Sequence, residues 1–303
     1  MHSHQMKFSF VIPSYDRKEV LQTCIKSIEK AYECAKEKDI ATEIVVVFCG
    51  INMEKSSFDL KYQDLTITQY SEENIVCRAK NIGIEKARGE YIVLIDDDAT
   101  VGENFLLKLN ELVQYEGNVY CAKIQDPVTA ECFSEKEKSL TGRKLRRVDY
   151  NLFKGSALII KKAVLMKAGL FSEEFGPGGQ YFSAEESDLF FRIKMLKEDV
   201  LYVPELVIYH PVYDTFPESN AYRYSYATGA MLTKYCFDDW SNMYAYLFLI
   251  ARLYAICSVR IIQTTLFPRL MSAKNEKRRY SFVVRGLTMG IIQYLKNRLL
   301  SGN

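Results

Sequence analysis

Three adjacent carboxylates are the clearest candidates for chemistry in this sequence. Asp96, Asp97 and Asp98 directly follow the mostly apolar run 90–95, which predicts a buried strand. Because like charges repel and desolvation strengthens the repulsion, the triplet must either be fully exposed in a turn or hold a cation. Carboxylate oxygens are hard ligands that suit Mg²⁺ or Mn²⁺, ions that commonly bridge to substrate phosphates. The residue pattern alone leaves both explanations open.

A second group of acids follows the Gly-rich loop 176–179. Glu185 or Glu186, beside such a flexible loop, could take a proton from a substrate hydroxyl. A structural interpretation is also available, because Ser183 and Glu186 match the S-x-x-E pattern of a helix capping box. Without further context the pattern favours the cap.

His210 is the third candidate. It follows the predicted strand 200–209, in which Pro204 is expected at an edge or a bulge. The other two histidines, His2 and His4, stand in the N-terminal segment. A lone histidine is more often structural than a ligand, but its ring nitrogen could add to a carboxylate metal site.

Strand and helix signals alternate through the first hundred residues and predict how these groups are positioned. The expected strands are 8–13, 43–48, 65–68 and 90–95, and the expected helices are 18–37 and 74–88, the second ending at Gly89. This alternation predicts an α/β fold, a mostly parallel sheet flanked by helices. Ligands of such sheets bind beyond the carboxyl ends of the strands, where the Asp triplet is expected.

Composition and length fit a folded protein with a substantial core. The chain has 303 residues, of which 48% are hydrophobic and 26% are charged. Its eight cysteines form no C-x-x-C pair, which favours free thiols in a reducing compartment. Residues 1–5 have no apolar signal core, so we expect a cytoplasmic protein, peripheral on the inner face of the cell membrane.

The composition changes after about residue 216. Residues 220–303 contain twelve Lys or Arg and three Asp or Glu, a net charge of +9, whereas the remainder carries −7. Such a split suggests an anionic partner for the C-terminal end, such as a membrane surface. Arg252 and Arg260 interrupt the aromatic and aliphatic run 244–260 too early for a bilayer span. The run therefore favours an interfacial amphipathic helix, or a helical pair packed on the main domain.

Several motifs, in order and at matching spacing, resemble those of family 2 glycosyltransferases of the GT-A fold. The N-terminal blocks are Val11-Ile12-Pro13-Ser14-Tyr15-Asp16-Arg17, Ala79-Lys80-Asn81-Ile82-Gly83-Ile84 and the run 87–98. Two later blocks, 169–175 and 185–189, resemble the G-x-F-x-E and E-D-x-D-L patterns of that family. The resemblance covers residues 7 to 213. It implies a GT-A catalytic domain over 1–215, followed by a helical, basic region over 216–303.

The resemblance also implies roles for the candidates. Asp98, Asp96 and His210 match the residues that contact a divalent metal, Mg²⁺ or Mn²⁺, in such enzymes. Glu186, with Glu185 beside it, matches the catalytic base. The donor-binding residues that the resemblance implies are Pro13, Ser14, Tyr15, Asp16, Lys80, Asp96 and Asp97.

Two positions differ from the family pattern. Phe48 and Cys49 stand where an Asp pair usually follows the second strand, so an acid that often meets the base or the ribose is missing. The base position holds Glu rather than the usual Asp, and the extra methylene moves the carboxylate. Either Glu185 or Glu186 therefore fits the role of base.

The implied function is inverting transfer of a sugar from a nucleotide-sugar donor to a hydroxyl of a saccharide acceptor. The basic, aromatic C-terminal region suits a lipid-linked acceptor at an anionic membrane surface, in bacterial capsule or other cell-surface polysaccharide synthesis. No nucleic-acid partner is expected. One alternative is a nucleotidyltransferase that makes sugar nucleotides, although no Gly-rich basic loop follows the first strand. The other is a degenerate sugar- or membrane-binding protein, against which the retained Asp triplet, both Glu residues and His210 argue.

Overall fold

The structure is a computed structural model that describes residues 6–15, 17–50, 60–62, 65–72, 75–115, 117–132, 141–211, 218–266 and 273–301. The chain forms two compact units. The first comprises Met1–Ser172 and Arg192–Val212, and the second comprises Glu173–Phe191 and Tyr213–Asn303. The first unit holds a large sheet, and the second holds the long C-terminal helices.

One sheet forms the centre of the first unit. Its described strands are β1 Phe8–Ser14, β2 Thr42–Cys49, β3 Thr66–Glu72, β4 Tyr91–Leu94, β5 Thr100–Val101, β6 Val119–Gln125, β7 Arg143–Lys144, β8 Leu158–Lys161 and β9 Val200–Tyr209. Their order is β3-β2-β1-β4-β8-β6-β9-β5, with β7 also paired to β9. Parallel pairing runs through β3, β2, β1 and β4 and returns between β6 and β9, whereas β8 is antiparallel to both neighbours. The predicted α/β class is confirmed.

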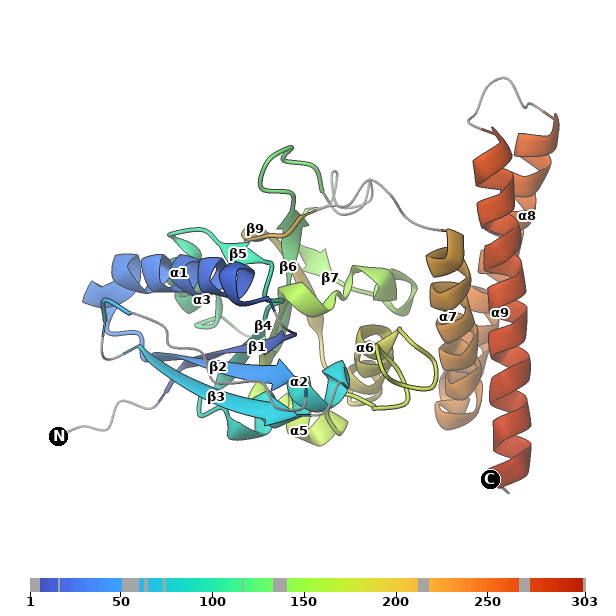
Figure 1. The fold of residues 1–303 in the computed structure, drawn as a ribbon. Helices are drawn as coiled ribbons and strands as arrows, with labels where there is room; N and C mark the ends of the chain where they lie inside the picture. The colour runs from blue at the N-terminus through green and yellow to red at the C-terminus, as the bar shows by residue number, and fades with distance from the viewer. Residues whose placement is uncertain are drawn as a thin grey trace. The chain divides into compact units, whose positions relative to one another are not determined.

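Helices cover both faces of this sheet, with α1 and α3 on one side and α2 and α5 on the other (Figure 1). The α-helices that precede the C-terminal region are α1 Lys18–Ala35, α2 Val76–Lys86, α3 Phe105–Leu112, α5 Lys162–Ala168 and α6 Glu185–Met195. Short 3₁₀ helices are η1 Lys36–Lys38, η2 Arg147–Leu152 and η3 Gly155–Ala157. Alternate residues of β1 point to opposite faces of the sheet. Phe8 and Phe10 belong to the buried cluster on the face that α1 covers. On the other face, a Cβ on Gly83 of α2 would overlap the Val11 side chain, so α2 packs closely on β1.

Gly89 was predicted to end the helix over 74–88, but it has a different role. α2 ends at Lys86, and Gly89 instead allows close approach to β1, because a Cβ there would lie 2.6 Å from the backbone nitrogen of Ser9. The Gly89 N–H donates to Ser9 Oγ at 2.8 Å, and Ser9 Oγ donates to the buried Glu43 carboxylate at 2.7 Å. Arg88 Nε also donates to Glu43, at 2.8 Å. This part of the motif therefore fastens the chain before β4 to β1 and β2.

The predicted irregularity at Pro204 is confirmed. The register between β6 and β9 shifts between Ala122 and Lys123, and the extra residues of β9 at that point include Pro204. Pro204 has no backbone N–H to donate to a neighbouring strand, and the bulge accommodates it without the loss of a ladder hydrogen bond. Beyond it β9 continues to Tyr209, so that His210 follows the strand directly.

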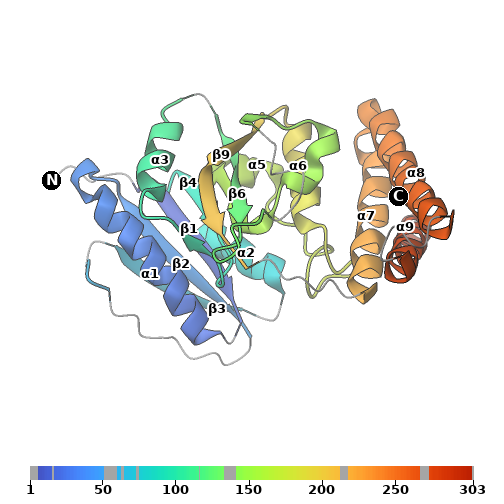
Figure 2. The same ribbon diagram turned by 90° about the horizontal axis from the view of Figure 1, so that it is seen from above.

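Three long helices dominate the second unit: α7 Glu218–Asp238, α8 Met243–Leu266 and α9 Ala273–Ser301, with η4 Trp240–Asn242 between α7 and α8. The three lie side by side (Figures 1 and 2). Glycines bring α7 and α9 close together, because a Cβ on Gly229 would overlap the backbone of Leu287 and one on Gly290 would overlap the backbone of Tyr226. Small residues at four-residue spacing, such as Gly286 and Gly290, permit this backbone contact.

α8 packs less completely than α7. The segment Trp240–Leu266 is the one helix in the described residues that is long and apolar enough to cross a membrane by length and composition. Its most apolar window has a mean hydropathy of 1.8, and 17% of that window is buried. Large exposed side chains on α8 include Tyr244, Phe248, Val259, Ile262 and Leu266. The helix expected over 244–260 therefore exists, but it extends further, to Leu266, so Arg252 and Arg260 do not make it too short or too polar for a span by length and composition.

Because α7 packs closely on α9, we expect a glycine-to-alanine substitution at their contact to lower the free energy of unfolding, whereas the same change usually raises it in a helix. Gly290→Ala would ordinarily stabilise a helix by about 1 kcal/mol. Here the added methyl meets the Tyr226 backbone, so we expect a net loss of roughly 1–3 kcal/mol in the free energy of unfolding. Denaturant unfolding measures the change, with Met289→Ala, at the exposed neighbouring position, as a control that alters stability little. A stabilised Gly290→Ala protein would contradict the packing.

Candidate active site

The Asp triplet lies in a turn at the carboxyl end of β4. Because β4 pairs in parallel with β1, the two strands end side by side. The Ala99 N–H donates to the Asp96 carbonyl at 3.1 Å and closes the turn. The exposed fraction of the side chain is 38% for Asp96, 12% for Asp98 and 1% for Asp97. The triplet is therefore neither fully exposed, as one explanation required, nor uniformly buried.

Asp97 is held by residues at the end of β1 and just beyond it. Ser14 Oγ donates to Asp97 Oδ2 at 2.7 Å, and the Arg17 guanidinium binds both carboxylate oxygens of Asp97. Arg17 Nη1 also donates to Asp98 Oδ2 at 2.8 Å. Burial alone would lower the pKa of Arg17, but the two carboxylates raise it above its ordinary value. Arg17 thus offsets part of the repulsion within the triplet.

The role of Arg17 was missed at the sequence level, although the residue stood in the first motif. The available signal was the basic pair Arg17-Lys18 just after the first strand, in a fold that places that strand beside the Asp-bearing one. The predicted donor-binding residue Asp97 contacts Ser14 and Arg17 in the structure, and its assignment to the donor stays a prediction.

The pairing of the short strand β5 with the long strand β9 brings His210 to the same turn. β5 follows the triplet and pairs with β9, with Thr100 opposite Tyr209. The His210 N–H donates to the carbonyl of Gln125, at the end of β6, at 3.0 Å. Nε2 of His210 then lies 3.1 Å from Oδ1 of Asp98 and 3.7 Å from Oδ2 of Asp96. Three residues that the sequence analysis named as metal ligands are therefore brought together.

The two ring nitrogens of His210 indicate what this cluster can bind. Nδ1 lies 2.8 Å from the Pro211 carbonyl, which can only accept, so Nδ1 carries a proton. In the neutral ring Nε2 is then unprotonated, and its lone pair faces the carboxylates and is repelled by them. Oδ1 of Asp98 is buried without a hydrogen-bond donor. A proton on Nε2, or a cation among the three ligand atoms, removes this repulsion; those atoms lie within 4.8 Å of one another. A metal-binding histidine commonly donates its other N–H to a carbonyl in this way.

The same contacts set the ionisation of the cluster. Burial alone would raise the pKa of Asp98, but His210 and Arg17 together lower it to about 2. Burial alone would lower the pKa of His210, but Asp98 and Asp96 raise it above its ordinary value. Asp98 is therefore an anion at neutral pH. One imidazole nitrogen and two carboxylate oxygens form a donor set that fits Mn²⁺ or Mg²⁺.

Three of the four donor-binding residues expected in the first motif, positions 13–16, lie at the end of β1. Pro13 and Ser14 close the strand, and Tyr15 follows it with 55% of its surface exposed. Asp16 lies outside the described residues. Of these residues, Ser14 is brought into contact with the Asp triplet through its bond to Asp97.

Lys80 lies on α2, close to the end of α5. It is buried, and its Nζ lies 5.0 Å from the centre of the Phe171 ring. The neighbouring Asn81 exchanges two hydrogen bonds with the Phe171 backbone, at 2.9 and 2.8 Å, and ties α2 to this segment. Phe48 and Cys49, which replace the acids usual in this family, end β2 and are buried. They supply no carboxylate there.

The two candidate base residues begin α6, in the second unit. Glu185 is buried and Glu186 is partly buried. The predicted capping box is wrong, because α6 begins at Glu185 and the buried Oγ of Ser183 has no hydrogen-bond partner. Phe182 and Ala184 have positive φ angles of 64° and 73°. Such strain in non-glycine residues persists only when the surroundings fix it, and it is concentrated at functional sites.

Tyr224 of α7 is a neighbour of these carboxylates that sequence reasoning missed. Burial raises the pKa of the Tyr224 hydroxyl, and the charges of Glu185 and Glu186 raise it further. The hydroxyl therefore stays protonated at neutral pH. No local sequence signal could have found this residue, because its position depends on how α7 packs against the first turn of α6.

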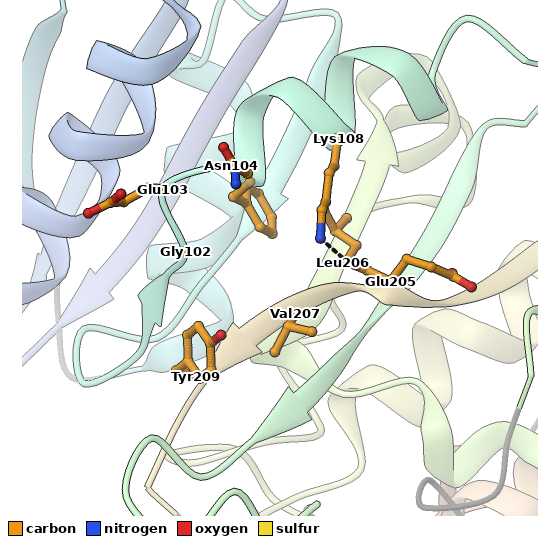
Figure 3. Close-up of a pocket in the computed structure, with 9 residues that line it drawn as sticks. Gly102, Glu103, Asn104, Lys108, Glu205, Leu206, Val207 and Tyr209 are labelled. Carbon is orange, nitrogen blue, oxygen red and sulfur yellow. Dashed lines mark hydrogen bonds between the residues drawn. The ribbon is translucent and has the colours of Figure 1, made fainter.

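A separate hollow of about 330 Å³ lies beside β5 and β9 (Figure 3). Glu103 and Lys108 line it on one side, and Glu205 and Tyr209 on the other. Lys108 Nζ donates to the Glu205 carbonyl at 3.2 Å. None of the described residues predicted for the site lines this hollow, although Tyr209 directly precedes His210. The hollow is therefore distinct from the carboxylate cluster.

Comparison with known sequences points to one family. The model of glycosyl transferase family 2 matches residues 9–160, which include β1, β4 and the Asp triplet. A curated relative, glycosyltransferase GlyG of Streptococcus pneumoniae serotype 4, is 28% identical over 210 residues. That match covers 64% of this chain and 67% of the relative.

Comparison with solved structures shows the same fold. Mannosyltransferase PcManGT from Pyrobaculum calidifontis, in complex with GDP-Man and Mn²⁺, has a TM-score of 0.59 at 13% identity, over 98% of this chain and 89% of its own. S. aureus TarS 1-349 in complex with UDP-GlcNAc has a TM-score of 0.55 at 14% identity, over 96% and 92%. Against a longer TarS structure the TM-score is 0.56 at 15% identity, over 77% of this chain but 40% of that one. With a family model that spans half of the sequence, and with this GT-A-like fold, the chain belongs to glycosyl transferase family 2.

Proposed function

We propose that the chain is an inverting glycosyltransferase that moves a sugar from a nucleotide-sugar donor to a hydroxyl of a saccharide acceptor. The observation that carries this proposal is the cluster of Asp96, Asp98 and His210 at the end of β4, in a chain of this family. The molecules bound to two structural neighbours, GDP-Man with Mn²⁺ and UDP-GlcNAc, support a nucleotide sugar as the class of donor.

The donor is bound by the first unit in this proposal. Asp96, Asp98 and His210 would hold Mn²⁺ or Mg²⁺, which when bound offsets the negative charge that develops on the leaving diphosphate. Tyr15, which directly follows Ser14 at the end of β1, is exposed and offers a ring on which a nucleobase can stack. Further donor contacts are assigned to Pro13, Ser14, Asp16, Lys80, Asp96 and Asp97.

The acceptor is activated by a carboxylate at the start of α6. Glu186, with Glu185 beside it, takes the proton of the acceptor hydroxyl. The freed oxygen forms a bond to the anomeric carbon as the bond from that carbon to the diphosphate oxygen breaks on the opposite side. Tyr224, a residue that is half exposed and lies near these carboxylates, carries a protonated hydroxyl that can donate a hydrogen bond.

The acceptor in this proposal is carried on a lipid at the inner face of the cell membrane, in cell-surface polysaccharide synthesis. Residues 1–215 form the catalytic region, and residues 216–303 associate with the bilayer. Support comes from the exposed apolar side chains of α8 and from the net charge of +9 over residues 220–303. Arg252 and Arg260 lie on exposed parts of α8. A charged side chain at the bilayer centre costs about 2.5–3.5 kcal/mol by insertion measurements, so α8 is placed in the interface rather than across the membrane.

A panel of nucleotide sugars tests the function against its two rivals. We expect metal-dependent release of nucleoside diphosphate from a nucleotide sugar in the panel. UDP-GlcNAc and GDP-mannose are the first two to assay, and at least one of them is expected to turn over. A nucleotidyltransferase would instead release pyrophosphate from a nucleoside triphosphate and a sugar phosphate. A degenerate binding protein would bind a nucleotide or a vesicle without any turnover.

Asp98→Ala is expected to abolish metal-dependent donor binding while the fold survives. The variant removes an anionic ligand, so turnover should fall by roughly 10²–10³-fold, the equivalent of several kcal/mol of charge stabilisation. Calorimetric titration of UDP and GDP, with and without Mn²⁺, measures binding independently of turnover. Asp199→Ala removes an exposed carboxylate elsewhere in the first unit and should behave as the wild type. Normal Mn²⁺-dependent binding and turnover in Asp98→Ala would rule out the metal assignment.

Glu186→Gln is expected to lower turnover by roughly 10²–10⁴-fold, because glutamine keeps the shape but cannot accept a proton. Thermal unfolding should change little. Glu185→Gln is the matched comparison, with the same chemical change one residue earlier. A larger kinetic loss in Glu185→Gln would exchange the two roles, and full turnover in both variants would exclude a base at this position.

The chain is expected to sediment with vesicles that contain anionic lipid and to detach partly at high salt. Each basic residue near such a surface contributes about 1 kcal/mol, and salt screens the attraction. Arg252, Arg260 and the run 277–279 should face the headgroups. Phe248→Glu should weaken sedimentation, whereas Val128→Glu, at another exposed apolar position, should not. A spanning helix would resist salt and require detergent, and a soluble helical unit would ignore vesicles of either kind.

A further inference from the structure

A buried ion pair ties the first turn of α6 to α7 within the second unit. Asp188 is fully buried, and Lys234 Nζ lies 2.9 Å from its Oδ1. The Tyr235 hydroxyl lies 2.8 Å from the Asp188 carbonyl and 2.9 Å from the same Oδ1. α7 therefore holds both the side chain and the backbone of one residue of α6.

Lys234 is also held by aromatic rings on two sides. Its Nζ lies 5.4 Å from the ring centre of Phe175 and 5.5 Å from that of Tyr235. Phe175 stacks on Tyr181, with ring centres 5.1 Å apart. A cation that is shared between a carboxylate and ring faces is fixed in position more firmly than one in an exposed pair. The ammonium group of Lys234 thus contacts both the loop before α6, through Phe175, and the first turn of α6, through Asp188.

Removal of either partner would be costly at this place. The Asp188 side chain has no exposed surface and that of Lys234 has 17%. Breaking such a pair leaves an uncompensated buried charge, unlike the loss of an exposed surface pair. The local structure would therefore have to move to let water or another donor reach Asp188.

Asp188 shares its helical turn with the two candidate base residues. Glu185, Glu186 and Asp188 are all in the first turn of α6, where the preceding residues Phe182 and Ala184 already have strained φ angles. A turn entered through strained residues needs an anchor that holds it in one orientation. The contacts of Asp188 with α7 supply that anchor two residues after Glu186.

We infer that Lys234 and Tyr235 are positioning residues, which orient the carboxylates of Glu185 and Glu186 by clamping Asp188. The inference rests on the proposed function for the identity of the base. In this inference α7 contributes to activation of the acceptor by holding α6 in place. This role is separate from any contact of the C-terminal helices with a membrane.

A double-mutant cycle tests whether Lys234 acts through the base. The proteins are the full chain with Lys234→Met, with Glu186→Gln and with both, assayed on the nucleotide sugar that turns over in the panel. A misplaced reacting group can cost roughly 10²-fold, so Lys234→Met should lower kcat by about 10–100-fold. It should leave Mn²⁺-dependent UDP or GDP binding unchanged, and Lys234→Arg should recover part of the loss. In the Glu186→Gln background the same change should cost much less, because the effects of groups that act as a unit are not additive.

Lys296→Met is the matched control, because Lys296 is an exposed lysine on α9. It should keep full turnover. Losses that add fully in the double variant, or an unaffected Lys234→Met protein beside an inactive Glu186→Gln protein, would overturn the inference and leave the proposed function standing. Full turnover in both Glu186→Gln and Glu185→Gln would contradict the proposed function instead.

Amide hydrogen exchange gives a second readout that does not depend on activity. Exchange over residues 183–190 should be faster in Lys234→Met than in the wild type, and unchanged in Lys296→Met. Should Lys234→Met fail to fold, Tyr235→Phe removes only one hydroxyl and keeps the ring, and it should still speed exchange over the same segment. Unchanged exchange over 183–190 in the folded variant would overturn the clamp, whatever its turnover.

Discussion

Three neighbouring negative charges at the end of a buried strand are the constraint on which the site depends. Each is accommodated in a different way. Asp97 turns inward and is bound by Ser14 and Arg17, Asp98 is shared between Arg17 and His210, and Asp96 keeps more than a third of its side chain exposed. An uncompensated buried carboxylate is expensive, so the strands that deliver these partners cannot be placed freely. The pairing of β1 with β4 brings Ser14 to the triplet, and the pairing of β5 with β9 brings His210 to it.

The parts of the fold that could be predicted were those encoded locally. Apolar runs marked β1, β2 and β4, and the Asp triplet stood at a strand end, where parallel sheets place their ligands. Gly89 and Ser183 show the limit. Each has a residue type that suits a helix terminus, yet Gly89 serves a close approach to Ser9 and Ser183 leaves its hydroxyl unbonded. In both cases contacts with residues far away in the sequence outweigh a local preference worth about 1 kcal/mol.

The site shows the same division between local and distant information. The carboxylates and His210 were identifiable by type and motif, and the structure brings one ligand atom each of Asp96, Asp98 and His210 within 4.8 Å of one another. The partners that hold such residues in place were not identifiable. The pairing of Arg17 with the triplet, and of Lys234 with Asp188, depends on which elements pack together, and nothing in either local stretch specifies it. Candidate site residues are thus easier to predict from the sequence than the partners that contact them.

The position of β9 has a consequence for how the protein is made. β5 has two residues and joins the sheet through β9, which lies between β6 and β5. The ribosome releases the Asp triplet and β5 long before it releases β9 and His210. During that interval the nascent chain has its acids but neither β9 nor the imidazole of His210. Pairings between distant segments form slowly. A partly synthesised chain of this kind therefore cannot bring His210 to Asp98 until β9 has been released and has paired with β6 and β5.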